Sequence, residues 1–218
     1  MALTIFDLDN TLLDGDSDYL WGGFLARQGI VDGADYDREN ERFYREYQDG
    51  TLDIQAFLRF SLRPLREQPR QRLEALREQF MEELIVPIML NKAWQLIATH
   101  RAAGDTLLII TATNAFVTAP IAARFGIPHL IATEPEIING QYTGEVAGIP
   151  AFREGKVIRL EQWLGEHQQT LADSTFYSDS HNDLPLLERV ERPVAVDPDP
   201  QLDVIATARG WTRLSLRR

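Results

Sequence analysis

The spacing of apolar residues changes along the chain and separates a short first segment from a long second one. Residues 3–6 (LTIF) form a short apolar run, which predicts a buried strand that stops at Asp7. From about Ser17 to His100 the apolar positions recur at helical spacing, and no strand is indicated. The predicted helices are Tyr19–Gln28, Tyr36–Gln48, Ile54–Leu62, Arg70–Glu83 and Ile88–His100, with breaks at Gly33, Gly50, Pro64 and Pro87.

Beyond residue 104, strand-like and helix-like segments alternate. The predicted strands are 105–113, 129–133, 175–180 and 193–196, and NGQYTG (139–144) is typical of a hairpin turn. The predicted helices are 114–125, Lys156–His167, Leu184–Arg189 and Leu202–Arg209. Strands that alternate with helices indicate a parallel sheet with right-handed crossovers. We therefore expect an α/β core of residues 1–14 and 87–218, with an all-helical domain of residues 15–86 inserted after the first strand.

The composition excludes several classes of function. The chain has no cysteine, which rules out disulfides and thiolate metal sites. Its formal net charge of −11 argues against a nucleic-acid-binding surface, which needs a basic stripe. No apolar run approaches the roughly 18 residues of a membrane helix, and the first residues resemble no signal peptide. We expect a cytoplasmic protein that acts on a small molecule and binds neither nucleic acid nor membrane.

Polar side chains gather where three of the predicted strands end. The first strand is followed by DLDNT (7–11), the second ends in TATN (111–114) and the fourth in SDSHND (178–183). Lys156 opens a helix directly after Gly155. Ligands of open parallel sheets bind beyond the carboxyl ends of the strands. The converging carboxylates, hydroxyls and ammonium group therefore suit a hard cation together with a phosphate group.

Each of these groups can serve phosphoryl transfer. Asp7 and Asp179 can supply the one or two carboxylates through which magnesium binds alongside a substrate phosphate. A carboxylate can also attack phosphorus and form an aspartyl-phosphate. Asp9 could then protonate the leaving alkoxide and later deprotonate the attacking water. Thr111 can hydrogen-bond a phosphate oxygen, and Lys156 adds a point charge to the same group.

The same segments resemble the four motifs of the haloacid dehalogenase superfamily of phosphohydrolases, in order, over residues 7–183. The resemblance implies a Rossmann-like core, and the helical block is similar to the cap of the phosphoserine-phosphatase-like subclass. It implies Mg²⁺ as cofactor, held by Asp7, Asp179 and the backbone carbonyl of Asp9. The other implied roles are Asp7 as nucleophile, Asp9 as acid and base, Thr111, Lys156 and Asn182 around the phosphate, and Asp183 orienting Lys156 or a metal-bound water.

Each residue also has a purely structural interpretation. Asp7 and Asp9 could cap a turn, and Thr111 is a typical strand residue. A lysine at a helix start is usually solvated, but Lys156 is one of only two lysines among 22 basic residues. His181 occupies a variable position of the fourth motif, which favours a loop residue at the entrance over a catalytic base. The complete set of motifs favours the catalytic interpretation for the others.

The predicted pocket departs from that of phosphoserine phosphatases. Those enzymes carry glycines after the second-motif hydroxyl and around the fourth-motif aspartate, where this chain has TATN and SDSHND. The stretch from YTGEVAGIPAFREGKV through SDSHNDLPLLERV is more similar to a bacterial branch that includes histidinol-phosphatase-like proteins. Asp16 lies where phosphoserine phosphatases place a cap glutamate on the substrate amine. A looser alignment puts Arg59 in place of their carboxylate-binding arginine.

The charge of the cap gives a further indication of the substrate. Residues 14–53 carry eleven acidic residues against four arginines, which favours a substrate with an ammonium or imidazolium group, although a solvated face would carry the same charges. We expect a magnesium-dependent phosphomonoester hydrolase for a small metabolite, with histidinol phosphate as first candidate. A phosphoserine phosphatase and a phosphotransferase are the alternatives within the same chemistry. The complete motif set argues against a binding protein with a residual site.

Overall fold

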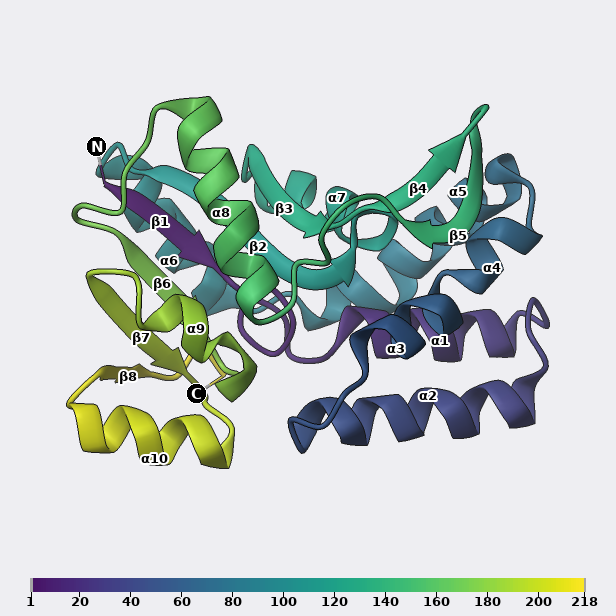
Figure 1. Ribbon diagram of the computed structural model, residues 1–218, viewed down its shortest axis with the longest axis horizontal. Coiled ribbons are helices and arrows are strands. Elements are labelled where there is room, and N and C mark those ends of the chain that lie inside the picture. The colour runs from purple at the N-terminus through teal and green to yellow at the C-terminus, as the bar shows by residue number, and fades with distance from the viewer. Residues whose placement is uncertain (1, 218) are drawn as a thin grey trace.

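The computed structural model describes residues 2–217 and places a twisted sheet at one end and a block of helices at the other (Figure 1). Six parallel strands pair in the order β3-β2-β1-β6-β7-β8, and β4 and β5 form a separate antiparallel hairpin. The strands are β1 (Leu3–Phe6), β2 (Thr106–Asn114), β3 (His129–Thr133), β4 (Pro135–Ile138), β5 (Gln141–Val146), β6 (Thr175–Ser178), β7 (Arg192–Val196) and β8 (Thr212–Leu214).

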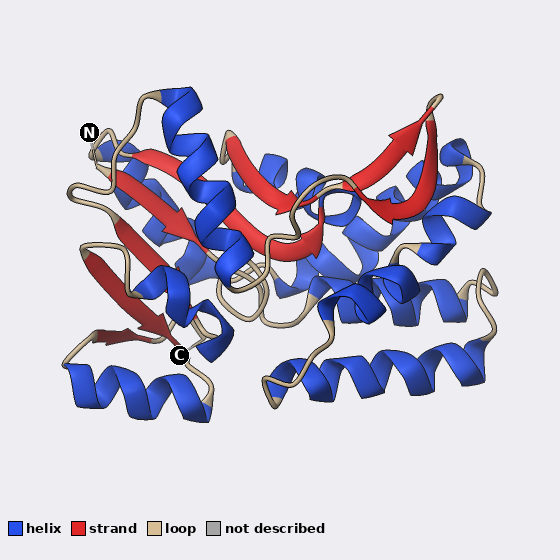
Figure 2. Ribbon diagram, in the orientation of Figure 1, coloured by secondary structure: helices blue, strands red, loops and turns tan. Residues whose placement is uncertain are grey.

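The helices fall into two groups, one inserted between β1 and β2 and one that connects the strands of the sheet (Figure 2). The inserted group consists of α1 (Ser17–Arg27), α2 (Gly33–Gln48), α3 (Ile54–Ser61), α4 (Arg63–Glu67) and α5 (Arg70–Phe80), followed by the short turns η1 (Met81–Ile85) and η2 (Val86–Ile88). The second group consists of α6 (Asn91–Ala102), α7 (Ala115–Phe125), α8 (Glu154–His167), η3 (His181–Asp183), α9 (Leu184–Leu187) and α10 (Pro200–Arg209). Among residues 2–217, no helix is long and apolar enough to cross a membrane.

Alternate side chains of the strands enter two apolar layers, one on each face of the sheet. Leu3 and Ile5 of β1 pack with residues of α8, α9 and α10, such as Leu160. Phe6 lies in the opposite layer, with residues of α6 and α7. Both faces of the sheet are thus covered, as a parallel sheet requires. The expected α/β fold with an inserted helical block is confirmed.

The helical block is attached to the core through two paired segments. Leu13 forms an antiparallel bridge with Met89, and the amide of Asp14 donates to the carbonyl of Ile88 at 2.8 Å. The chain therefore leaves and re-enters the core at one place, beyond the carboxyl ends of the strands (Figure 1). The limits of the two domains, with residues 15–86 as the cap, stay a prediction.

Four of the five inserted helices share a hydrophobic cluster with the core. Trp21 of α1 packs edge-on against Phe80 of α5, with 5.1 Å between ring centroids, and lies 5.8 Å from Phe116 of α7. Buried residues of α3 and α4 belong to the same cluster, whereas none of the described residues of α2 does. Phe43 of α2 instead belongs to a smaller cluster that reaches the core at Phe152. Helix α2 is therefore the inserted helix with the weakest apolar attachment to the core.

Differences from the predicted elements lie mainly at their ends. The helix predicted over 88–100 begins only at Asn91, because Met89 pairs with Leu13 in the segment that leads from β1 to α1. Pro64 lies in the first turn of the unpredicted helix α4 (Arg63–Glu67), where a helix tolerates proline. The hairpin turn consists of Asn139 and Gly140 alone, both at positive φ, and its strands extend outside the predicted 139–144. Strand β6 ends at Ser178, two residues early, and the three-residue edge strand β8 was not predicted.

Candidate active site

The carboxyl ends of the central strands bring the predicted carboxylates together. Asp7 follows β1 directly, and its amide donates to the carbonyl of Tyr177 in β6 at 2.9 Å, which holds the residue at the strand end. Asp179 follows β6, the neighbouring strand. Thr111 lies near the end of β2, which ends at Asn114, close to the predicted 105–113, with an irregularity in its pairing with β3. The two aspartates and the threonine still meet at the same edge of the sheet.

Lys156 joins two buried carboxylates. Its side chain is 2% exposed, and its Nζ lies 2.8 Å from Oδ1 of Asp7 and 2.7 Å from Oδ1 of Asp183. The hydroxyl of Ser178 donates to Asp183 at 2.7 Å and fixes the far side of that carboxylate. Desolvation favours neutral lysine, but the charges of Asp183 and Asp7 outweigh it, and the pKa of Lys156 is raised above its ordinary value. Lys156 therefore carries a permanent positive charge at this point.

The hydroxyl of one threonine lies within hydrogen-bond distance of the carboxylates of both Asp7 and Asp179. The hydroxyl of Thr11 lies 3.3 Å from Oδ2 of Asp7 and 3.2 Å from Oδ1 of Asp179, and it accepts the amide of Asp179 at 3.0 Å. Desolvation raises the pKa of Asp7 to about 7 against the opposing charge of Lys156. Desolvation, and next the charge of Asp7, raises the pKa of Asp179 well above its ordinary value. Lys156 thus compensates the charge of Asp7, whereas none of the described residues forms an ion pair with Asp179.

This pair of carboxylates fits a divalent cation with oxygen ligands. Magnesium binds through one or two carboxylates and completes its shell with water and substrate oxygens. Among the described residues, no three or more His, Cys, Asp or Glu side chains converge on a possible metal position, so the donor set is not the closed cage of a structural metal site. Asp7 and Asp179, with the backbone carbonyl of Asp9 as the predicted third ligand, would suit a cation that must leave room for a phosphate.

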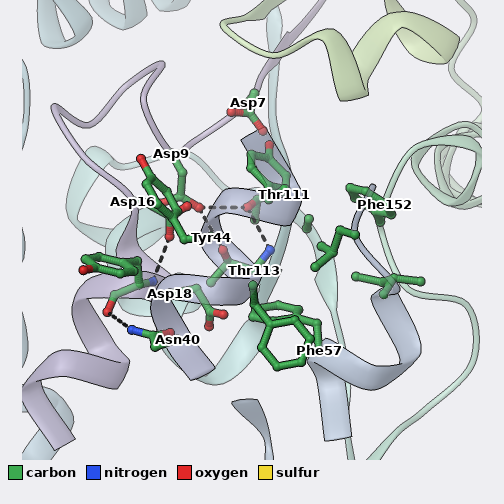
Figure 3. Close-up of a pocket in the computed structure, with 16 residues that line it drawn as sticks. Asp7, Asp9, Asp16, Asp18, Asn40, Tyr44, Phe57, Thr111, Thr113 and Phe152 are labelled. Atoms are coloured by element: carbon green, nitrogen blue, oxygen red, sulfur yellow. Dashed lines mark hydrogen bonds between the residues drawn. The ribbon is translucent and has the colours of Figure 1, made fainter. Parts of the chain in front are cut away.

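Asp9 accepts hydrogen bonds on both carboxylate oxygens. Its Oδ1 accepts the amide of Ser17 at 2.6 Å. Its Oδ2 accepts the hydroxyls of Thr113 at 2.8 Å and Thr111 at 3.5 Å (Figure 3). Desolvation and then the charge of Asp16 raise the pKa of Asp9 to about 6. The Thr111 hydroxyl also accepts the amide of Thr113 at 3.2 Å. Thr113 was not predicted as a site residue, although it is two residues from Thr111 along one strand.

A pocket between the sheet edge and the inserted helices opens onto Asp7 and Asp9 (Figure 3). Aromatic side chains and carboxylates form its walls, and among the described residues no arginine, lysine or histidine lines it. The lining residues are Asp7, Asp9, Asp16, Asp18, Tyr19, Asn40, Phe43, Tyr44, Tyr47, Leu52, Ile54, Phe57, Thr111, Ala112, Thr113 and Phe152.

Two aspartates at the start of α1 face this pocket. Asp16 caps the helix, because its carboxylate accepts the amide of Tyr19 at 2.8 Å. Asp18 is 9% exposed, and its Oδ1 accepts the side-chain amide of Asn114 at 3.2 Å. Desolvation, as the largest cause, raises the pKa of each of the two carboxyl groups to about 7. Asp16 was predicted to face the substrate; Asp18 was not, although it lies only two residues further along.

Asn182, His181 and Arg59 do not line this pocket, and neither do Lys156, Asp179 and Asp183. The amide of Asn182 bonds to Arg153 and to the carbonyl of Tyr47, so its predicted contact with phosphate stays a prediction. His181 Nδ1 lies 2.7 Å from Oδ2 of Asp199, and its buried Nε2 has no hydrogen-bond partner among residues 2–217. Arg59 lies exposed on α3 and does not line the pocket.

Comparison with known proteins agrees with the fold and the chemistry of the site. A histidinol-phosphatase of Neisseria meningitidis serogroup C (strain 8013) is 45% identical over 219 residues and covers 99% of both chains. The phosphoserine phosphatase SerB1 of Mycobacterium tuberculosis is 31% identical over 96% of this chain and 69% of its own.

Solved structures show the same architecture. A protein of unknown function from Bordetella pertussis Tohama I, 48% identical, superimposes with a TM-score of 0.93 over 99% of this chain and 98% of its own. A phospho-aspartyl intermediate analogue of phosphoserine phosphatase matches over all of this chain and 94% of its own, with a TM-score of 0.73 at 19% identity, which shows a common fold. The family model of haloacid dehalogenase-like hydrolases matches residues 4–188. The chain therefore belongs to the haloacid dehalogenase-like hydrolase family and is a phosphatase.

Proposed function

We propose that the phosphatase reaction proceeds through an aspartyl-phosphate at Asp7. One carboxylate oxygen of Asp7 attacks phosphorus, the ester P–O bond breaks, and the side chain of Asp9 gives its proton to the leaving alkoxide. Asp9 then takes a proton from the water that attacks the aspartyl-phosphate, which releases inorganic phosphate and restores Asp7. Lys156 neutralises charge on the phosphoryl oxygens while Asp183 holds its ammonium group.

Magnesium is the proposed cofactor. Asp7, Asp179 and the carbonyl of Asp9 would hold it, and when bound it supplies positive charge to the phosphate and to the two facing carboxylates. Rapid quenching of the wild-type protein during turnover, followed by mass spectrometry, tests the nucleophile. Phosphate on Asp7 is expected, and Asp7→Asn should abolish turnover because a carboxamide is a poor nucleophile. A phosphate label on any other residue would contradict the assignment.

Histidinol phosphate is the proposed substrate, and the lining of the pocket carries this proposal. Asp16 and Asp18 stand near Asp9 with no basic side chain in the lining to offset them. An ammonium or imidazolium group would supply that positive charge, and the aromatic walls suit a flat cationic ring. Histidinol phosphate offers both cations and has no carboxylate. The histidinol-phosphatase name of the 45% identical relative supports the same choice.

Phosphoserine fits the pocket less well. Its carboxylate would enter a space lined by carboxylates, and like charges that face each other without compensation cost on the order of a kcal/mol or more. The arginine that could have bound this group, Arg59, does not line the pocket. The 31% identical phosphoserine phosphatase keeps phosphoserine as the second candidate.

A screen of phosphate esters with magnesium present separates the candidates. Histidinol phosphate should have the highest kcat/KM, ahead of phosphoserine and of a neutral aryl phosphate. Asp16→Asn and Asp18→Asn should raise KM for histidinol phosphate and barely change it for the aryl phosphate. The control is Asp35→Asn, an exposed aspartate paired with Arg38 on the outer surface of α2. Phosphoserine in first place, or equal effects on both esters, would refute recognition of a cation.

The same assay tests for phosphotransfer. An alcohol acceptor added to the reaction would yield a new phosphate ester if the aspartyl-phosphate passes its phosphoryl group to alcohols. We expect inorganic phosphate as the main product with and without the acceptor, because hydrolysis needs only water and Asp9. A new ester as the main product would favour a phosphotransferase.

A further inference from the structure

The C-terminal end of α2 is hydrogen-bonded to two loops that carry catalytic groups. Arg153 comes from the turn before α8, three residues ahead of Lys156. Asn182 comes from η3, directly before Asp183. Both side chains bond to main-chain carbonyls at the end of α2. These contacts form a seam between the inserted helices and the core.

The guanidinium of Arg153 is the centre of this seam. Its Nη2 donates to the carbonyl of Gly50 at 2.5 Å, and its Nε and Nη2 lie 3.0 and 2.9 Å from Oδ1 of Asn182. Nδ2 of Asn182 donates to the carbonyl of Tyr47 at 3.0 Å. One guanidinium thus joins the end of α2, the start of α8 and the η3 turn. A planar group with several fixed donors is suited to such a junction.

Gly50 permits the close approach of these segments. It has a φ of +72°, and a Cβ at this position would lie 2.7 Å from Nε2 of His181 and 3.2 Å from Nη2 of Arg153. His181 is held in turn by Asp199, at 2.7 Å. The seam therefore has no space for a side chain at residue 50 unless the imidazole or the guanidinium moves.

The backbone of Arg153 is itself in an unusual conformation. Its φ of +49° and ψ of −119° lie in a region that residues other than glycine rarely adopt. Such a conformation persists only where surrounding contacts hold it. The hydrogen bonds of the Arg153 side chain to Gly50 and Asn182 are contacts of this kind. The start of α8, and with it Lys156, therefore depends on contacts made across the seam.

The placement of α2 depends on the hydrogen bonds of the seam more than that of the other inserted helices does. Among the described residues it contributes nothing to the large hydrophobic cluster shared by the core and the other inserted helices. It nevertheless supplies four of the residues that line the pocket, namely Asn40, Phe43, Tyr44 and Tyr47. A displaced α2 would therefore leave the pocket open to water.

We infer that Arg153 is a positioning residue that couples the seating of α2 over the pocket to the placement of Lys156 and Asp183. When α2 is seated, the Gly50 carbonyl completes the contacts that hold the strained turn and the η3 loop. When α2 is displaced, both loops lose a hydrogen-bond partner at once. Full catalytic geometry is thereby tied to a closed pocket, whichever phosphate ester occupies it.

Hydrogen exchange measures this coupling without any substrate. The amides of Gly50 and Thr51 bond within the end of α2, and those of Gly155 and Lys156 bond within the turn before α8. Gly50→Ala changes a residue on the α2 side of the seam, and its Cβ would displace the imidazole of His181 or the guanidinium of Arg153. We expect it to speed exchange at residues 153–157 as well as at 47–51. Exchange that stays unchanged at 153–157 would overturn the coupling.

Kinetics gives the second measurement, with an aryl phosphate at saturating concentration. Arg153→Met should lower kcat on the order of 10- to 100-fold, since small misplacements of catalytic groups have effects of this size. Arg153→Lys, which can still donate to the Gly50 carbonyl, should recover part of the loss. In the double variant of Arg153→Met and Gly50→Ala, kcat should be no lower than in the worse single variant. Multiplied losses would show two independent effects and refute a shared seam.

The chain offers a matched control at the opposite edge of the sheet. Arg101 donates from Nη2 to the carbonyls of Phe125 and Gly126 at 3.1 Å each, and a Cβ on Gly126, at a φ of +66°, would lie 3.2 Å from that nitrogen. Arg101→Met and Gly126→Ala remove the same kind of contact and should lower the melting temperature without changing kcat. If the Arg153 variants likewise changed only the melting temperature, the residue would have a structural role alone, and the inference would be wrong.

Discussion

Replacement of Asp18 by asparagine should stabilise the protein in the absence of substrate and metal. Asp18 is 9% exposed, and its carboxylate accepts a hydrogen bond from the neutral amide of Asn114. Among the described residues, no basic side chain lines the pocket that it faces. Desolvation raises its pKa from 3.8 to about 7. At about 1.4 kcal/mol for each pH unit, the ionised group costs the folded state about 4 kcal/mol above pH 7. Asparagine can still accept the hydrogen bond and carries no charge.

The pH dependence of the free energy of unfolding shows whether ionisation of Asp18 is the cause of the stability difference. Because the pKa of Asp18 is higher in the folded protein, the folded state binds more protons than the unfolded chain between about pH 4 and 7. The contribution of Asp18 to the free energy of unfolding therefore falls as the pH rises through this interval and is constant above it. The advantage of Asp18→Asn should be near zero at pH 4 and largest at pH 8. For a chain of this length, about 4 kcal/mol corresponds to a rise in Tm of roughly 10 °C.

Thermal or denaturant unfolding in chelator at several pH values measures this difference. The variant Asp35→Asn is the control, since Asp35 is exposed and its surface pair with Arg38 contributes at most about 1 kcal/mol. An advantage for Asp18→Asn that does not change with pH would show that ionisation is not the cause. A less stable variant at pH 8 would refute the argument that the pocket holds an uncompensated carboxylate.

Three further predictions concern the catalytic groups. Asp9→Asn should lower kcat steeply and leave magnesium affinity largely intact, because only the backbone carbonyl of Asp9 is expected to bind the metal. Loss of magnesium affinity with unchanged kcat at saturating metal would show that the side chain binds the metal and does not transfer the proton. Chelators should abolish activity and calcium should inhibit it, since calcium accepts more ligands and would bind Asp7 through both oxygens; full activity in chelator would exclude a metal-dependent reaction. Gly155→Ala should lower both kcat and Tm, because its Cβ would lie 2.0 Å from the carbonyl oxygen of Pro150. The control is Gly165→Ala on the same helix, whose Cβ meets nothing within 4 Å and which should be neutral or stabilising. Equal behaviour of the two variants would contradict the steric argument.

The sequence alone was sufficient to predict the fold class and to place several polar side chains at the carboxyl ends of the strands. Alternation of strands and helices predicts a parallel sheet, in which the residues that follow the strands gather at one edge. For this reason Asp7, Lys156 and Asp183 could be expected near one another, and their side chains are hydrogen-bonded in the structure. Asp7 and Asp179 likewise lie on either side of the Thr11 hydroxyl.

Other features depend on contacts that no local pattern contains. The contact of Arg153 with Gly50 joins residues 103 positions apart, and the choice between Asp16 and Asp18 depends on how α1 is oriented over the sheet. One missed residue did have a sequence signal. Thr113 lies two positions from Thr111 in a strand, and side chains at this spacing share a face, so its hydroxyl could have been expected beside Asp9.

The separation of α2 from the shared hydrophobic cluster affects how the substrate range of such an enzyme can change during evolution. Most mutations that remove core contacts cost stability, and a new activity is accessible only if the fold tolerates the change. Here pocket-lining side chains that would select a substrate, such as Phe43 and Tyr44, lie on α2. Mutations on this helix disturb the shared cluster least, because its described residues do not belong to it. Lineages with the same nucleophile could therefore exchange one leaving group for another through changes confined to a single surface helix.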